Sequence, residues 1–432
     1  MLLRTDEQTI NDLGIFGSKG SGSIYEIYNR ISSRGGEAVL EEMFRQPLSD
    51  KEAIDRRIGI IESFTRSNIR FPYKAALIDA TEKYLTDRKQ DTKNEIGPTF
   101  LGEKEMQNGV GAILEVLQQT RHFVDSAAIR TISPFSMERE AISGLLTDEA
   151  FAPVFKERSG NRLPFSALTA YDSLFRITEK QKLKKLLGYM YYLDVYISVA
   201  DIARERNFIF PRALDKGLGE LHLEGVFHPS LKTPVANDIR MDTSQNVIFL
   251  TGANMAGKST FLRSVSTALY LAHMGFPVAA RSMEFSVMDG IYTTVNLPDN
   301  LGIGASHFYA EVLRVKKIAL ELSTGKSFFI LFDELFRGTN VKDAYEATVA
   351  VAFGFATRKN SLFIVSSHIV EAATQLEQKA NIGFFYLPTR MVGHVPEYTY
   401  KLEKGITDDR HGMIIIKNEG ILEILKNGKK LS

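Results

Sequence analysis

The sequence predicts a multidomain chain in which an all-α half precedes an α/β half built on a mainly parallel sheet. From Ser23 to Phe64, and again over residues 104–128 and 171–207, apolar residues recur three or four positions apart, as on one face of a helix. After Pro211, short apolar runs rich in β-branched residues alternate with helical stretches, which is typical of parallel strands covered on both faces. The 432 residues, 44% of them hydrophobic, suffice for two or three domains.

The composition changes along the chain predict four segments. Residues 1–22 end in Gly17–Gly22, which favours neither helix nor strand, so we expect a flexible N-terminal tail. A helical domain should follow over residues 23–225, an α/β domain over 226–410 and a short C-terminal segment over 411–432. Because no proline interrupts residues 171–207, we expect one continuous helix of roughly 50 Å there.

Charge and cysteine content exclude several classes of protein. The formal charge is +1, so any nucleic-acid surface must be local. The chain has no cysteine, which removes disulfides, zinc–thiolate sites and thiol nucleophiles. Arg4, Asp6 and Glu7 interrupt the apolar run that a signal peptide needs, and no segment approaches 18 uncharged apolar residues. We therefore expect a cytoplasmic protein with no membrane partner.

A glycine-rich loop follows the apolar run Val247–Leu250 and precedes a helical pattern. Thr251–Thr260 satisfies Gly-x-x-x-x-Gly-Lys-[Ser/Thr], the pattern of a P-loop. Gly252 and Gly257 allow backbone N–H groups to face phosphate oxygens, Lys258 neutralises their charge, and the Ser259 hydroxyl can ligate Mg²⁺. The sequence therefore predicts a nucleoside triphosphate and Mg²⁺ as ligands.

Two further apolar runs end in residues suited to phosphate chemistry. Asp333 and Glu334 follow Phe328–Phe332, where Asp333 can hold Mg²⁺ through water and Glu334 can activate the attacking water. The run 361–365 ends in Ser366-Ser367-His368, and His368 stands where a sensor of the γ-phosphate would lie. These residues predict a nucleotide hydrolase without choosing its kind.

Longer strings resemble the ATPase motifs of the MutS family of DNA mismatch-repair proteins. In order and spacing these strings are TGANMAGKSTFLR (251–263), DGIYTTVNLPDNLGIGASHFYAE (289–311), FDELFRGTN (332–340) and SSH (366–368). Ser23–Arg57 likewise resembles the start of the family's core domain, and Leu193–Pro211 the end of its lever helix. The resemblance spans about residues 23–425.

The resemblance implies a core and lever domain followed by an ABC-like P-loop ATPase domain that works as a homodimer. Ser306 would reach the partner's γ-phosphate in trans, His368 would act as a switch beside the catalytic Glu334, and residues 411–432 would help to join subunits. Tyr400 falls where the family has a histidine that stacks on adenine, while Ala253 and Ala256 replace a proline and a glycine. The implied ATP-binding residues are Gly252, Asn254, Met255, Gly257, Lys258, Ser259, Thr260 and Tyr400, and Ser259 and Asp333 are the implied metal ligands.

The resemblance has no counterpart before Ser23 for the mismatch-reading and connector domains, so the sequence does not support full mismatch recognition. We expect an ATP-dependent DNA-binding protein of the MutS type, whose hydrolysis moves the lever in mismatch repair or on another DNA structure, together with a repair partner protein. Lysines 180, 182, 184 and 185 are candidates for contact with DNA. The alternatives are an ABC- or SMC-like ATPase that acts on a protein without binding DNA, and a scaffold that does not hydrolyse ATP.

Overall fold

A computed structural model describes residues 1–17, 22–86, 102–158, 160, 162–253, 255–295, 297, 307–392, 395–407 and 420–427. The chain divides into two compact units. The α/β unit comprises Met1–Ile27, Gln46–Asp55 and Phe208–Ser432, and the helical unit comprises Tyr28–Arg45 and Arg56–Asn207. None of the helices in the described residues combines the length and apolar content that crossing a bilayer requires.

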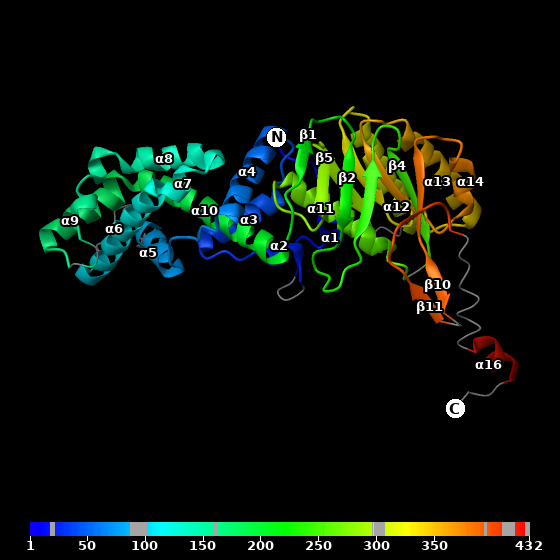
Figure 1. Ribbon diagram of the computed structural model, residues 1–432, viewed down its shortest axis with the longest axis horizontal. Coiled ribbons are helices and arrows are strands. Elements are labelled where there is room, and N and C mark those ends of the chain that lie inside the picture. Colours follow the sequence, from blue (N-terminus) through cyan, green and yellow to red (C-terminus); the bar gives the residue numbers. More distant parts are fainter. Residues whose placement is uncertain are drawn as a thin grey trace, which may run out of the picture. The chain divides into compact units, whose positions relative to one another are not determined.

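The helical unit is arranged around its longest helix, α10 (Lys180–Arg206), which packs against α3, α5 and α8. Figure 1 shows these helices in blue to green. Asp194, in the middle of α10, is buried and accepts hydrogen bonds from the backbone N–H of Ser32 and Ser33 and from the Ser33 hydroxyl. Its carboxylate thereby holds Ser33, whose Oγ accepts from the N–H of Gly36 at 3.1 Å and caps the N-terminus of α3. The remaining helices are α3 (Arg34–Arg45), α4 (Lys51–Ser67), which begins in the α/β unit, α5 (Ala75–Thr86), α6 (Glu103–Asp125), α7 (Ala127–Arg130), α8 (Ser136–Leu146) and α9 (Phe165–Ser173).

The prediction of one unbroken helix over residues 171–207 is wrong. A π-helical turn, η4 (Leu174–Thr178), separates α9 from α10. Arg176 in this turn is buried and forms a 3.3 Å ion pair with Asp172, which also accepts a hydrogen bond from the Tyr84 hydroxyl. Burial of this polar cluster accompanies the change in helical hydrogen bonding, which periodicity alone does not reveal. At the other end, Asn207 terminates α10 with a φ of 54°.

The main sheet of the α/β unit has the strand order β12-β9-β4-β8-β7-β6. All its strand pairs are parallel except β12 with β9. The apolar runs that predicted strands at 247–250, 328–332 and 361–365 are confirmed in β4, β7 and β8, which are buried at every position. The six strands are β4 (Val247–Gly252), β6 (Gly290–Thr294), β7 (Phe328–Phe332), β8 (Leu362–Ser366), β9 (Ile382–Leu387) and β12 (Glu403–Lys404).

Helices pack around this sheet, and a second sheet stands beside it (Figure 1). The second sheet has the order β1-β5-β2-β3, in which β1 and β5 are parallel and the other pairs antiparallel. Its strands are β1 (Arg212–Leu214), β2 (Leu221–Val226), β3 (Asn237–Met241) and β5 (Ser282–Ser286), and β10 (Thr389–Val392) and β11 (Val395–Tyr398) form a hairpin. The helices are α11 (Lys258–His273), α12 (His307–Leu322), α13 (Val341–Ala356), α14 (Glu371–Leu376) and α16 (Ile421–Asn427).

Two predicted segment boundaries are wrong. Residues 1–17 are not a flexible tail: α1 (Glu7–Asp12) is capped by Asp6, and Leu3, Thr9, Leu13 and Ile15 are buried in the α/β unit. The short helix α2 (Ile24–Tyr28) follows. The helical segment does not extend to residue 225, because α10 ends at Arg206 and Phe208 re-enters the α/β unit. Pairing with residues distant in sequence orders both stretches, and local composition does not report such pairing.

Candidate active site

The loop that follows β4 turns sharply into α11. Gly252, Met255 and Gly257 have φ angles of +139°, +70° and +98°, and Gly257 is the residue from which α11 begins. A Cβ atom on Gly257 would lie 2.9 Å from the Tyr400 ring, so a larger residue would clash there as well as adopt a strained φ. Ala253 and Ala256 are not among the residues with positive φ, so alanine is accommodated at both positions without that strain. Asn254 lies outside the described residues.

Lys258, the first residue of α11, is buried beneath this loop. Its Nζ donates hydrogen bonds to the Gly252 carbonyl at 2.7 Å and the Ala253 carbonyl at 3.1 Å. Burial lowers the pKa of Lys258, and the charges of Glu334 and Asp333 oppose that shift. A buried cation at the start of a helix provides the charge and donors that an anionic group requires.

Ser259 and Asp333 meet at the carboxyl edge of the sheet. The Ser259 Oγ donates to Asp333 Oδ2 at 2.5 Å, and the Ser366 Oγ donates to Asp333 Oδ1 at 2.5 Å. The three residues come together because β4 and β7 both pair with β8, so the ends of three parallel strands adjoin. The backbone N–H of Glu334 also donates to Ser366 Oγ, at 2.9 Å.

A hydroxyl and a carboxylate are oxygen donors of the kind that Mg²⁺ prefers. Within the described part of the chain no three His, Asp or Glu side chains gather as a metal-binding group. Mg²⁺ commonly takes only one or two carboxylates and completes its shell with water and substrate phosphates. The pair Ser259 and Asp333 therefore fits a Mg²⁺ ion that arrives with a nucleotide.

Glu334 lies beside this pair, held on both carboxylate oxygens. Oε1 is 2.7 Å from His368 Nε2, and Oε2 is 2.7 Å from Arg337 Nη1. Partial burial alone would raise the pKa of Glu334, but the hydrogen bonds and charges of His368 and Arg337 lower it below the usual value. Glu334 and Phe336 both have positive φ, 56° and 60°, an uncommon conformation for large residues that marks a strained turn.

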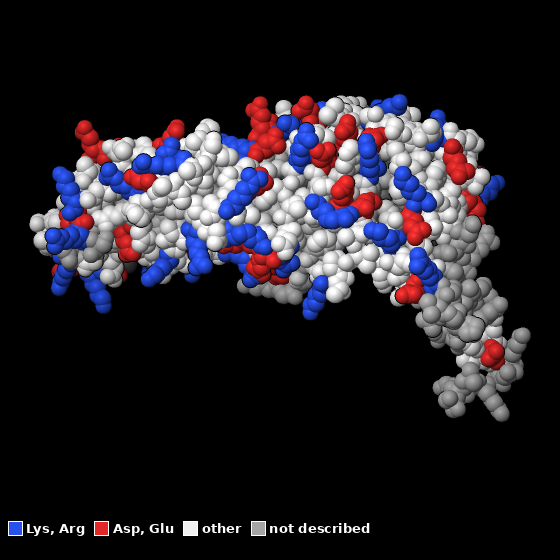
Figure 2. All heavy atoms as spheres, viewed as in Figure 1, with Lys and Arg blue, Asp and Glu red and all other residues white. Residues whose placement is uncertain are grey.

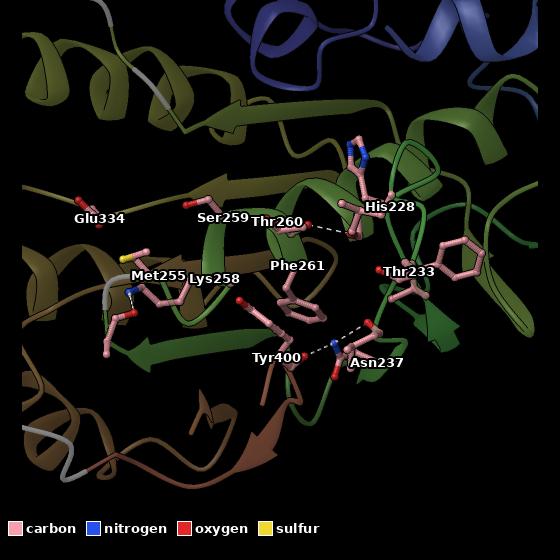
Figure 3. A pocket seen from close by; sticks show the side chains of 17 residues that line it. His228, Thr233, Asn237, Met255, Lys258, Ser259, Thr260, Phe261, Glu334 and Tyr400 are labelled. Carbon is pink, nitrogen blue, oxygen red and sulfur yellow. Dashed lines mark hydrogen bonds between the residues drawn. The ribbon is translucent and has the colours of Figure 1, made fainter. Parts of the chain in front are cut away.

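A cavity of about 460 Å³ opens next to Lys258 and Ser259 (Figure 3). Tyr400 lines it with a φ of +54°, and its backbone carbonyl accepts a 2.9 Å hydrogen bond from Asn237 Nδ2. Asn237 is buried and also accepts a 2.7 Å hydrogen bond from the backbone N–H of Leu402, so one side chain fixes the backbone on both sides of Lys401. The Tyr400 ring lies next to Gly257 on the cavity wall.

The structure brings most of the predicted site residues together. The cavity is lined by seven of them: Met255, Gly257, Lys258, Ser259, Thr260, Glu334 and Tyr400. Three others contact these residues. The Gly252 carbonyl accepts from Lys258, Asp333 accepts from Ser259, and His368 contacts Glu334. Ser306 lies outside the described residues. Sequence reasoning did not assign the remaining lining side chains, most of which precede the glycine-rich loop by 14 or more positions, while Phe261 and Ser264 lie in the helix that follows it. They include Phe227, His228, Leu231, Thr233, Val235, Asn237, Phe261 and Ser264.

Comparisons with known proteins agree with this architecture. Residues 248–431 match the family MutS domain V, so the fold is a mixed α/β chain that carries this domain. Residues 248–431 thus carry a domain of the MutS family, and the resemblance drawn from the sequence motifs is confirmed.

Three relatives illustrate the extent of the similarity. The DNA mismatch repair protein MutS of Fusobacterium nucleatum is 29% identical over 94% of this chain and 44% of its own length. The DNA mismatch repair protein MSH7 of Arabidopsis thaliana is 28% identical over 81% of this chain and 36% of its own length. The DNA mismatch repair protein MutS of Petrotoga mobilis is 23% identical over 99% of this chain and 64% of its own length. The chain thus spans less than two thirds of each of these proteins.

Proposed function

We propose that this chain is a Mg²⁺-dependent ATPase of the MutS type that works as a homodimer on DNA. One observation carries the proposal: a buried lysine, a serine–carboxylate pair and a second carboxylate converge at one sheet edge beside the cavity. These residues are Lys258, Ser259, Asp333 and Glu334. The match of residues 248–431 to MutS domain V supports the same interpretation.

Each residue has a role that its position favours. The Lys258 Nζ would exchange its two carbonyl acceptors for phosphate oxygens. The negative charge of the phosphate would offset the cost of burying the lysine charge. Ser259 and Asp333 would hold Mg²⁺, which neutralises phosphate charge when it is bound. The Tyr400 ring, about half exposed on the cavity wall, would stack on adenine.

Glu334 is the candidate general base for hydrolysis. Its carboxylate would accept a proton from a water molecule as the water oxygen bonds to the γ-phosphorus and the bond to the β-phosphate oxygen breaks, which releases ADP. The 2.7 Å contact with His368 holds one carboxylate oxygen in place. Both Oε atoms are engaged, so the Arg337 contact would have to open before Oε2 could meet water.

Exposed apolar side chains favour a homodimer. Met255 in the loop after β4 is 76% exposed, and Val341 at the start of α13 is 73% exposed. In α16, which falls within the proposed dimerisation segment 411–432, Ile421, Leu422, Ile424 and Leu425 are all exposed. A second copy would cover such groups, and Ser306 would then complete the partner's site in trans, as the resemblance implies.

The DNA target is proposed from the relatives, which are named DNA mismatch repair proteins. On the face shown in Figure 2, basic side chains lie among acidic ones, so contact with DNA would be local. Lys182 is engaged with Asp148 at 2.5 Å and Glu179 at 2.7 Å, which leaves Lys184 and Lys185 as the more available groups of that run. The helical unit would act as the core and lever domain, and either mismatch repair or recognition of another DNA structure is compatible with these features.

The deciding experiment is steady-state ATP hydrolysis by the full chain with no DNA, homoduplex, mismatched duplex and a four-way junction, at low and physiological salt. We expect Mg²⁺-dependent hydrolysis that Lys258→Ala abolishes and that Lys359→Ala, a change of an exposed lysine, leaves intact. Stimulation by mismatch or junction above homoduplex supports DNA as the ligand. Hydrolysis indifferent to every DNA contradicts that part and directs the search to a protein partner. Absence of Lys258-dependent hydrolysis contradicts the ATPase itself.

A further inference from the structure

The N-terminal segment, defined here as Arg4–Asp12, covers the outer edge of the main sheet. β6 is the last strand in the order β12-β9-β4-β8-β7-β6, so none of the described strands pairs with its outer backbone groups. An edge strand of this kind usually needs cover. Arg4 provides it at one end: its N–H donates to the Asp289 carbonyl at 2.8 Å, and its carbonyl accepts from the N–H of Ile291 at 2.9 Å.

The cover continues along β6 through side chains of α1. The N–H of Thr293 donates to the Thr9 Oγ1 at 3.0 Å, and the N–H of Val295 donates to the Asp12 Oδ2 at 2.9 Å. The same Asp12 oxygen accepts from the Thr293 hydroxyl at 3.0 Å. Every second amide from Ile291 to Val295 is therefore satisfied by the N-terminal segment, and Thr9, Asp12 and Thr293 are all buried.

A buried ion pair fixes the same strand end from α12. Arg314 is 7% exposed and pairs with Asp6, which also accepts from Lys317 Nζ at 2.7 Å. Arg314 uses its other donors on β6: Nη2 lies 2.7 Å from the Thr293 carbonyl, and Nε lies 3.1 Å from the Thr294 hydroxyl. Asp6 thus orients the Arg314 guanidinium, which donates hydrogen bonds to Thr293 and Thr294 of β6.

Thr293 and Thr294, the residues bonded by Arg314, lie beside Asp333, the proposed Mg²⁺ ligand. The N–H of Asp333 donates to the Thr294 carbonyl at 2.8 Å, which ties the end of β7 to the end of β6. Thr294, Val295, Asp333 and Glu334 also line one small cavity of about 80 Å³. A displacement of Thr294 or Val295 would therefore move the wall of the site and the backbone of Asp333 together.

We propose that Asp12, with Thr9 and the Asp6–Arg314 pair, is a positioning residue of the ATPase: it holds the end of β6 so that Asp333 and Glu334 meet Mg²⁺ and water in register. The inference rests on the proposed function. Asp12 itself touches neither nucleotide nor metal in this scheme and acts through Thr293, Val295 and the backbone bond to Asp333. Catalysis is sensitive to small misplacements of this kind, since about 1 Å can cost about 100-fold in rate.

The test compares Asp12→Ala with Arg4→Gln in the full chain. Arg4 lies on the same segment, but its side chain is 44% exposed and pairs with Glu321 at 2.7 Å without contacting Asp12, Thr293 or Val295 in the bonds described above, so its replacement is the matched control. For Asp12→Ala we expect kcat to fall about tenfold or more and the Mg²⁺ concentration for half-maximal rate to rise. Binding of ATP without Mg²⁺ should stay within about twofold of wild type, because the loop after β4 is untouched.

Amide hydrogen exchange supplies a readout independent of activity. Exchange in peptides spanning 290–295 and 328–336 should accelerate in Asp12→Ala and remain as in wild type in Arg4→Gln. If Asp12→Ala does not fold, Thr293→Val removes only the hydroxyl that meets Asp12 and carries the same expectations.

The proposal is overturned if folded Asp12→Ala keeps the wild-type kcat and Mg²⁺ dependence. This holds even if its amide hydrogen exchange accelerates, because the segment would then have a structural role only. If the wild-type chain itself shows no Lys258-dependent hydrolysis, the proposed function has failed. Equilibrium binding of Mg²⁺–ADP then replaces kcat: weaker binding in Asp12→Ala than in Arg4→Gln supports the positioning role, and equal binding overturns it.

Discussion

Ser259 and Asp333 are 74 positions apart in the sequence, and their side chains share a 2.5 Å hydrogen bond at the carboxyl edge of the main sheet. The Glu334 backbone N–H donates to Ser366, which in turn bonds Asp333, and the charges of Asp333 and Glu334 both act on the buried Lys258. In the proposed function, Ser259 and Asp333 would hold Mg²⁺, Lys258 would bind phosphate and Glu334 would activate water. The following predictions test how each part contributes.

Glu334→Gln should separate binding from hydrolysis. The amide keeps the size of the side chain and can still contact His368, but it cannot accept the proton of water, so kcat should fall by about 100-fold or more while ATP still binds. Because ATP is not consumed, dimers should accumulate in the presence of Mg²⁺–ATP. Single-turnover kinetics and size-exclusion chromatography measure both effects. Glu371→Gln, on an exposed glutamate of α14, is the control, and hydrolysis at the wild-type rate in Glu334→Gln would show that another group is the base.

Tyr400→Ala should weaken ATP binding and spare the chemistry of bound ATP. Stacking between an aromatic side chain and a base contributes about 1–3 kcal/mol, so we expect the Kd for ATP to rise about tenfold with little change in kcat. Tyr400→Phe keeps the ring and should bind almost as wild type. Titration of Tyr400→Ala with ATP and with free triphosphate tests whether the ring contacts adenine. If the Kd values of both ligands rise equally, Tyr400 acts on the neighbouring loop at Gly257 and not on adenine.

Asp6 should make the α/β unit sensitive to acid. Burial alone would raise its pKa, but hydrogen bonds from Arg314 and Lys317 and the charge of Arg314 hold that pKa far below the usual value. A carboxyl with a lowered folded-state pKa contributes stability above its unfolded pKa of about 3.9, and this contribution disappears as pH falls towards the folded value.

Asp6→Asn measures this contribution. Near neutral pH the variant should lose about 2 kcal/mol of unfolding free energy, because the acceptor is no longer charged. The difference from wild type should shrink as urea unfolding is repeated from pH 6 towards pH 3. Glu7→Gln, an exposed neighbour in α1, should show no such pH-dependent difference. A difference that stays constant down to pH 3 would contradict the assignment.

Asp194→Ala should destabilise the helical unit. The variant removes a buried acceptor of three donors from Ser32 and Ser33 and no longer holds Ser33, whose Oγ caps α3, at a cost of about 3 kcal/mol. Asp201→Ala on the same helix removes a carboxylate that is 48% exposed and should cost within about 0.5 kcal/mol. Thermal unfolding of both variants measures the contrast, and equal losses would mean that the hydrogen bonds of Asp194 to Ser32 and Ser33 do not stabilise the helical unit.

Local sequence determined the parts of this protein that depend on contiguous residues. Strands β4, β7 and β8 are encoded by unbroken apolar runs because parallel strands are buried on both faces. The motif residues from Gly252 to Ser259, and Asp333 at the end of β7, could be assigned because their chemistry depends on their place at strand ends. Their convergence follows once β4 and β7 flank β8.

Tertiary structure alone decided the remainder, because the partners lie far apart in the chain. Asp12 and Val295 are separated by 283 positions, so no local pattern could show that the first 17 residues cover a sheet edge. The same holds for Asn237, which fixes the backbone at Tyr400 from 163 positions away. Composition made the N-terminal segment look unstructured, yet hydrogen bonds to the exposed edge of β6 order it, since an unpaired strand edge stabilises whatever segment can satisfy its backbone groups.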